Sequence, residues 1–326
     1  MPGAAFGRIM LVHPAAVPMP PLRLAAAPAG PTPSVLAVYL ALIAAAAFTG
    51  GSSVTFLALG HRPMQVLLSL TGGVLLGVGL LHLLPHAFLQ LDRRIDATMQ
   101  WVLAGFFLMF VLERAFHGHA HHTADGGTPA HECGHHHGPH DRHDAPNPAA
   151  NGRWAWCGAF AGLALHSLAD GAALAASVRT DADHGVGWLA GLATFLAVLL
   201  HKPFDAAIIA ALMLGAGASP RARWIANGLY ALVVPLGAAL FLGSLWACGG
   251  RQETLLGVAL SAAAGAFLCI AAADLLPEVQ FHSHDRVLLT VSLALGLGIA
   301  WGITAIERSS HDHGRGGPPA AARTGP

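Results

Sequence analysis

Two short segments of the chain repeat the same pair of metal-binding residue types at the same spacing. His166 and Asp170 lie four positions apart, and so do His201 and Asp205. On an α-helix, residues four apart project from one face with their Cβ atoms about 5–6 Å apart. If the two helices face each other, two imidazoles and two carboxylates surround one point. This ligand set suits zinc or a similar divalent ion, so the pattern predicts a four-ligand metal site.

The alternative is that the two pairs are structural hydrogen bonds between packed helices. Ionisable residues inside apolar segments usually mark a functional site. A buried carboxylate also carries a desolvation penalty of several kcal/mol unless a cation neutralises it. Because the pair occurs twice, in neighbouring apolar segments, the metal site is the favoured interpretation.

Lys202 directly follows His201 and is the only lysine of the chain, since the other sixteen of the 17 basic residues are arginines. It lies near the middle of an apolar segment, too deep for its ammonium to reach water easily. We expect the ammonium to lie against Asp170 or Asp205 as a fixed positive charge beside the metal. A purely structural ion pair is the alternative. Pro203 removes a backbone donor and is expected to loosen the helix beside the site.

Further polar residues at the ends of apolar segments are candidate stations on a metal route. Four of them form two pairs at four-residue spacing, and one precedes the long polar loop. Taken singly, such residues are more typical of a membrane interface than of a metal site, so they rank below the central four. These candidates are His82, His86, Glu113, Asp274, Glu278, His282 and His284.

One connection between the apolar segments, residues 117–152, is long and rich in histidine. Its Gly, Pro and polar residues exclude a packed core and predict a disordered segment. Imidazoles favour zinc, copper or nickel over calcium or magnesium. We therefore expect weak, multiple metal sites that collect or sense the ion rather than conduct it. The loop histidines are His117, His119, His121, His122, His131, His135, His136, His137, His140 and His143.

The composition indicates a membrane protein. Of the 326 residues, 54% are hydrophobic and 10% are charged, whereas a soluble domain usually carries about 25% charged residues. Basic and acidic residues number 17 each, and without a basic surplus nucleic acid is not an expected partner. The four cysteines form no CxxC pair and predict no disulfide framework.

Eight apolar segments are long enough to cross a bilayer core of ~30 Å, which takes about 20 residues each. Lipid offers the backbone no hydrogen-bond partner, so we expect eight helices and an all-α polytopic membrane protein. Residues 34–116 would hold three helices and residues 153–308 five, between disordered tails at 1–33 and 309–326. The segments are 34–59, 64–89, 98–114, 154–178, 186–215, 223–247, 254–277 and 287–306.

A short string near the end of the second segment recurs in the seventh. The first reads His82-Leu-Leu-Pro-His86 and the other Asp274-Leu-Leu-Pro-Glu278. With eight spans, these two segments run in opposite directions. The similarity therefore suggests that spans one to three and six to eight are inverted repeats on either side of a central pair, an arrangement found in many transporters.

The residues described above resemble those of the ZIP (Zrt/Irt-like) divalent-metal transporters. The resemblance rests on the eight spans, the His-rich loop between spans three and four, the paired H-x-x-x-D motifs, and the HLLPHAF and DLLPE strings, and it covers residues 34–306. It implies a 3+2+3 helix bundle with both termini outside the cytoplasm, and a homodimer in the lipid bilayer of a bacterial inner membrane. It implies a transporter without a catalytic cofactor, which takes up Zn²⁺, or Cd²⁺, Fe²⁺, Mn²⁺, Co²⁺ or Ni²⁺, by an elevator-like movement of spans one, four, five and six.

Three features depart from the pattern of that family. Its fourth-span motif usually reads H-N-x-P-E/D-G, but Ser167 and Ala169 stand in place of Asn and Pro. Lys202 stands where an acidic residue commonly follows the first His or Gln of span five, and Val234 where some members have Glu. All these changes fall on the second metal of the family's two-metal centre. The resemblance thus implies a single-metal site in which the Lys202 ammonium replaces the second cation.

Three other functions use similar residues. A cation diffusion facilitator, which exports metal, also carries His/Asp pairs, but it is expected to have six spans and a folded C-terminal domain. The 18 residues after residue 308 are too few for that domain. A membrane-embedded zinc hydrolase needs an acid or base beside the metal, and Lys202 is a poor candidate for that role. A sequestering protein that uses only the loop leaves the intramembrane pairs unexplained. We therefore expect a transporter and not an enzyme.

Overall fold

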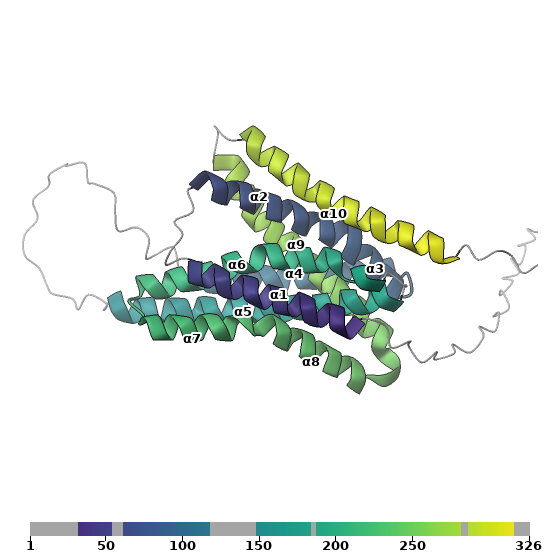
Figure 1. Ribbon diagram of the computed structural model, residues 1–326, viewed down its shortest axis with the longest axis horizontal. Coiled ribbons are helices and arrows are strands. Elements are labelled where there is room, and N and C mark those ends of the chain that lie inside the picture. The colour runs from purple at the N-terminus through teal and green to yellow at the C-terminus, as the bar shows by residue number, and fades with distance from the viewer. Residues whose placement is uncertain (1–31, 54–60, 118–147, 184–186, 282–285, 316–326) are drawn as a thin grey trace, which may run out of the picture. The chain divides into compact units, whose positions relative to one another are not determined.

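A computed structural model describes residues 32–53, 61–117, 148–183, 187–281 and 286–315 of the chain. All regular structure in these ranges is helical (Figure 1). The α-helices are α1 (Thr32–Ser53), α2 (His61–Val78), α3 (Leu84–Gln90), α4 (Ile95–His117), α5 (Pro148–Asp183), α6 (Leu192–Gly215), α7 (Pro220–Ala231), α8 (Val233–Ala247), α9 (Gln252–Phe281) and α10 (Arg286–Arg315). A π-helical turn η1 (Gly79–Leu83) joins α2 to α3, and short 3₁₀ turns η2 (Gly187–Leu189) and η3 (Gly249–Arg251) precede α6 and α9.

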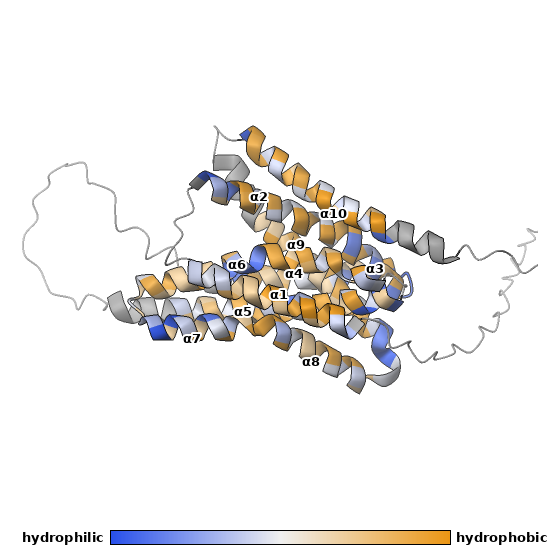
Figure 2. Cartoon of the chain, viewed as in Figure 1, coloured by the Kyte–Doolittle hydropathy of each residue, from blue (hydrophilic) through white to orange (hydrophobic). Residues whose placement is uncertain are grey.

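Eight stretches of helix in the described residues are long and apolar enough to cross a membrane. Figure 2 shows hydrophobic residues along much of their length. The predicted all-α polytopic membrane protein is thereby confirmed. The second span joins α2, η1 and α3, and the sixth joins α7 and α8.

Two prolines explain where these composite spans are interrupted. Pro85 has no N–H, and in the turn before it the Leu84 N–H reaches five residues back to the Gly79 carbonyl, which makes the π-helical turn η1. Pro235 has no N–H to donate to the carbonyl of Ala231, four residues earlier, and α7 ends at Ala231. Pro203, in contrast, lies inside α6, which continues through it as one helix.

Several helices extend beyond the predicted segment ends, and α5 and α10 do so furthest. α5 begins at Pro148 rather than at 153, because proline is favoured at the first helical position, where its missing N–H costs nothing. α10 continues to Arg315 rather than ending at 308, since no glycine or proline occurs after 308 until Gly314. Residues 309–315 thus belong to α10 in the described structure.

The helices pack as two groups (Figure 1). In one group, α1 packs on α6 and α5 packs on α8, with α7 against α1 and α6. In the other, α2 packs on α10 and α4 packs on α9, with α2 and α3 against α9. We call them the α5–α6 group and the α2–α9 group. They meet where α5 contacts α4 and α9, and where α6 contacts α2.

Glycines allow α5 and α8 to approach at backbone distance. A Cβ atom at Gly171 would collide with the carbonyl of Val234, and one at Gly237 would collide with the carbonyl of Leu168. Small residues at helix contacts are typical of membrane bundles, where packing rather than the hydrophobic effect drives association. This close contact holds the end of α7 beside the His/Asp pair of α5.

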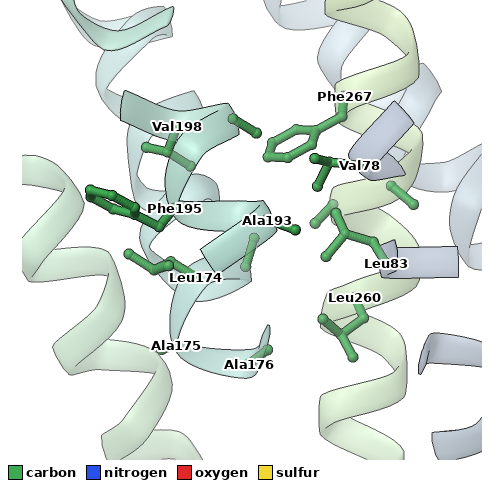
Figure 3. Close-up of a cluster of buried hydrophobic side chains, with 14 of the residues drawn as sticks. Val78, Leu83, Leu174, Ala175, Ala176, Ala193, Phe195, Val198, Leu260 and Phe267 are labelled. Atoms are coloured by element: carbon green, nitrogen blue, oxygen red, sulfur yellow. The ribbon is translucent and has the colours of Figure 1, made fainter. Parts of the chain in front are cut away.

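A buried apolar layer lies where the two groups meet (Figure 3). Leu174 of α5 and Val198 of α6 contribute from one group, and Val78 of α2, Leu83 of η1 and Phe267 of α9 from the other. All five side chains are almost completely buried. Because Leu174 lies one helical turn after Asp170, the layer covers one end of the His/Asp site.

The packing of α8 on α5 is testable with two glycines of the same helix. Gly237→Leu forces a side chain against the backbone of α5, which costs about 1–3 kcal/mol. We expect its thermal unfolding midpoint in detergent to fall by several degrees. Gly243→Leu is the matched control, because a Cβ atom there meets nothing within 4 Å. Equal midpoints for the two variants would contradict the described contact.

Candidate metal centre

Helices α5 and α6 bring together the four residues singled out in the sequence. His166 Nε2 lies 3.1 Å from Asp170 Oδ2 and 3.7 Å from Asp205 Oδ2. His201 Nε2 lies 3.3 Å from both His166 Nε2 and Asp170 Oδ2. Two ligands bound to one tetrahedral zinc ion at about 2.0–2.1 Å are themselves about 3.3 Å apart. The ligand atoms of His166, Asp170 and His201 all lie within 4.8 Å of one another, and their separations match those of ligands around one ion. Asp205 lies outside this group of three and approaches it at His166.

The orientation of the two rings suits metal binding. His201 Nδ1 lies 2.7 Å from the carbonyl oxygen of Ala197, which can only accept a hydrogen bond, so Nδ1 carries the proton. The Nε2 lone pair then faces His166 and Asp170. A metal-binding histidine is usually oriented by a hydrogen bond from its other nitrogen. His166 also turns Nε2 toward the cluster, and it lines a cavity of about 320 Å³ between α4, α5 and α9.

Lys202 supplies the positive charge of the site. Its Nζ lies 2.6 Å from Asp170 Oδ2 and 2.7 Å from Asp205 Oδ2, and its side chain is completely buried. The ammonium thus contacts the same carboxylate oxygens that face the histidines. With neutral imidazoles, two carboxylates and one ammonium leave the cluster with one net negative charge. A divalent ion would reverse that sign.

Tyr230 belongs to the site and was missed in the sequence. Ser167 donates a hydrogen bond to the Tyr230 hydroxyl at 2.9 Å, and that hydroxyl donates to Asp205 Oδ2 at 3.2 Å. The sequence held one signal for it. Tyr230 lies four residues before Val234, and the family resemblance already assigned Val234 to the metal centre.

Three of the route candidates, His82, His86 and Glu113, have side chains among the described residues, and none of them joins this centre. His82 and His86 lie together elsewhere, with two carboxylates that the sequence analysis missed, Asp181 and Glu307. Glu113 Oε2 lies 3.9 Å from Cys269 Sγ. The side chains of Asp274, Glu278 and His117, together with the whole of His282, His284 and the other loop histidines, lie outside the described residues.

Comparison with known proteins shows what this chain resembles. The family model described as ZIP Zinc transporter matches residues 34–306. The chain is 26% identical to the zinc transporter ZIP1 of Mus musculus over 270 residues, and 29% identical to that of Homo sapiens over 273. Each alignment covers 76% of this chain and 80% of the relative. It is 30% identical to the zinc transporter ZIP4 of Rattus norvegicus over 275 residues, which is 69% of this chain and 40% of that protein.

The hydrogen bonds of Tyr230 can be tested against the second tyrosine of the chain. Tyr230→Phe removes a buried donor to a carboxylate, and we expect it to cost about 1.5–3 kcal/mol of unfolding free energy. Tyr39→Phe is the control, because Tyr39 is also buried but its ring stacks on Phe195. A thermal or denaturant unfolding series measures both. Similar losses in the two variants would contradict the role assigned to the Tyr230 hydroxyl.

Proposed function

The chain belongs to the ZIP zinc transporter family, and we propose that it moves Zn²⁺ into the cytoplasm through the His/Asp site between α5 and α6. The observation that carries this proposal is the group formed by His166, Asp170 and His201, whose ligand atoms lie 3.1–3.3 Å apart, with Asp205 3.7 Å from His166. His166, Asp170, His201 and Asp205 would bind one ion together. Imidazole and carboxylate ligands suit zinc and its neighbours in the first transition series. Cd²⁺, Fe²⁺, Mn²⁺, Co²⁺ and Ni²⁺ are the other candidate substrates.

Lys202 is proposed to act as a fixed cation in place of a second metal. It already contacts one oxygen of each carboxylate, and a bound ion would share those oxygens with the ammonium. The repulsion between the two cations weakens binding. A transport site needs such moderation, because the ion must leave as well as enter. Ser167 is engaged with Tyr230, and Val234 offers no ligand atom, so little remains to bind a second ion.

The helix packing supports an elevator-like movement of the α5–α6 group. Every residue of the proposed site, and Tyr230 beside it, belongs to this group. The group could therefore move past the α2–α9 group and carry the site with it. Its spans are one, four, five and six, the same four that the family resemblance implies.

The same packing supports the proposed 3+2+3 inverted repeat. In an inverted repeat, spans one, two and three correspond to spans six, seven and eight, and span four corresponds to span five. The contact between α2 (span two) and α10 (span eight) then has as its counterpart the contact between α9 (span seven) and α4 (span three), and both contacts are present. Likewise, the contact between α1 (span one) and α6 (span five) has as its counterpart the contact between α8 (span six) and α5 (span four). A homodimer in a bacterial inner membrane, and a His-rich loop that collects or senses metal, complete the proposal.

The site assignment is tested by zinc uptake into proteoliposomes. Asp170→Asn and Asp205→Asn each remove a charged ligand, and we expect both to abolish saturable uptake. Asp183→Asn is the matched control in α5, because this exposed carboxylate pairs with Arg179 and lies away from the site. Uptake by the control should equal that of the wild type. Wild-type uptake by both site variants would refute the assignment.

The role of Lys202 is tested by reversing its charge. Lys202→Glu replaces a repelling cation with an additional carboxylate, so we expect zinc affinity to rise roughly tenfold or more. Maximal uptake should fall, because tighter binding slows release. Lys202→Arg keeps the positive charge and is the control. Chelator competition and uptake kinetics give the two quantities. An unchanged affinity in Lys202→Glu would show that the ammonium does not act on the bound ion.

A further inference from the structure

A second cluster of ligand residues lies apart from the central site, and we call it the His82 cluster. It consists of His82 in η1, His86 in α3, Asp181 in α5 and Glu307 in α10. His86 Nδ1 lies 3.0 Å from Asp181 Oδ1, and His82 Nε2 lies 3.6 Å from Asp181 Oδ2. One ligand atom from each of these three residues lies within 4.8 Å of the other two. The two distances from Asp181 to the histidines, 3.0 and 3.6 Å, lie on either side of the distance of about 3.3 Å expected between two ligand atoms of a tetrahedral zinc ion.

The two carboxylates of this cluster are buried, and in the described residues their charged-group partners are imidazoles alone. Asp181 is 0% exposed and Glu307 is 4% exposed. In the described part of the chain neither carboxylate pairs with Lys or Arg, and the side-chain nitrogens that face them belong to His82 and His86. With neutral imidazoles the cluster carries two negative charges. A buried carboxylate is costly without a counter-charge, and one divalent ion would neutralise both.

Neighbouring groups hold the ligand side chains in place. The Gly191 N–H donates to Asp181 Oδ2 at 2.7 Å. Thr194 donates to Ser177, whose own hydroxyl hydrogen is then free to donate to His82 Nε2 at 2.9 Å. This leaves the ring proton on Nδ1, which lies 2.9 Å from Glu307 Oε2. A carboxylate behind one nitrogen of a histidine, with metal at the other, is a common arrangement in metal sites. A metal ion at His82 Nε2 would take the lone pair that accepts from Ser177, and the Ser177 hydroxyl would turn away.

The His82 cluster is separate from the central site. Asp181 follows Asp170 by eleven residues, which corresponds to about 16 Å along α5. Buried apolar side chains, among them Leu174 and Val198, occupy the interval (Figure 3). One ion cannot contact both clusters. The His82 cluster also joins the two helix groups, since Asp181 comes from the α5–α6 group and the other three residues come from the α2–α9 group.

We infer that the His82 cluster is a second metal-binding site, with His82, His86 and Asp181 as ligands and Glu307 orienting His82. Two imidazoles and a carboxylate select a transition-metal ion such as Zn²⁺ over Ca²⁺ or Mg²⁺. An ion bound there links the two helix groups and stabilises their described arrangement. The inference requires no transport through the central site, so it goes beyond the proposed function.

Protection of an introduced thiol tests this site in the full chain. His86 is the ligand with the most accessible side chain, at 19% exposure, so a small alkylating reagent can reach a thiol there. In His86→Cys protein, zinc should bind the thiolate and slow alkylation at least tenfold, whereas Mg²⁺ should have no effect. Mass spectrometry of the peptide that carries position 86 separates this thiol from the four native cysteines and from the His-rich loop.

Additional variants in the His86→Cys background separate this inference from the proposed function. Asp181→Asn, which keeps an acceptor for the Gly191 N–H, should abolish protection by zinc, and Glu307→Gln should weaken it. If Asp181→Asn does not fold, the loss of zinc protection is measured in Glu307→Gln instead. His166→Ala removes a ligand of the central site and should leave protection intact. Absence of protection in His86→Cys, or full protection in both carboxylate variants, would overturn the inference.

Discussion

The central site depends on the buried Asp170 carboxylate, the partly buried Asp205 carboxylate and the single ammonium that contacts both. Asp170 and Asp205 each have an oxygen within 2.7 Å of Lys202 Nζ. Without that ammonium, the two negative charges, one of them fully buried, would face each other at a cost of several kcal/mol. With it, the cluster keeps one net negative charge beside two imidazole nitrogens. The carboxylates are thus stabilised without metal and still attract a divalent ion.

The surrounding helices position the side chains of this charge cluster. Gly171 and Gly237 let α5 and α8 touch, which places Tyr230 within hydrogen-bonding distance of Asp205. The Ala197 carbonyl fixes the ring of His201, so its free lone pair faces the cluster. These groups all lie in the α5–α6 group, whereas the α2–α9 group reaches the site through Phe267, whose ring lies edge-on to that of His201.

Local sequence patterns predicted the spans and the central residues. Apolar runs gave the eight membrane-crossing stretches, and four-residue spacing placed each His and Asp on one helix face. Tyr230, Asp181 and Glu307 were missed because their partners are distant in the sequence, on other helices. His82 and His86 were noticed as a pair, but no local pattern connects them with residues 181 and 307. Such clusters follow from helix packing, which the sequence analysis could not derive.

The most direct test of the central claim is the position of zinc itself. A crystal of the zinc-loaded full chain, measured on both sides of the zinc absorption edge, gives an anomalous difference map that locates the ion. We predict one peak among His166, Asp170, His201 and Asp205, at about 2.0–2.1 Å from their ligand atoms, with Lys202 still beside the carboxylates. No peak among these residues, or two peaks with Lys202 displaced, would contradict the account.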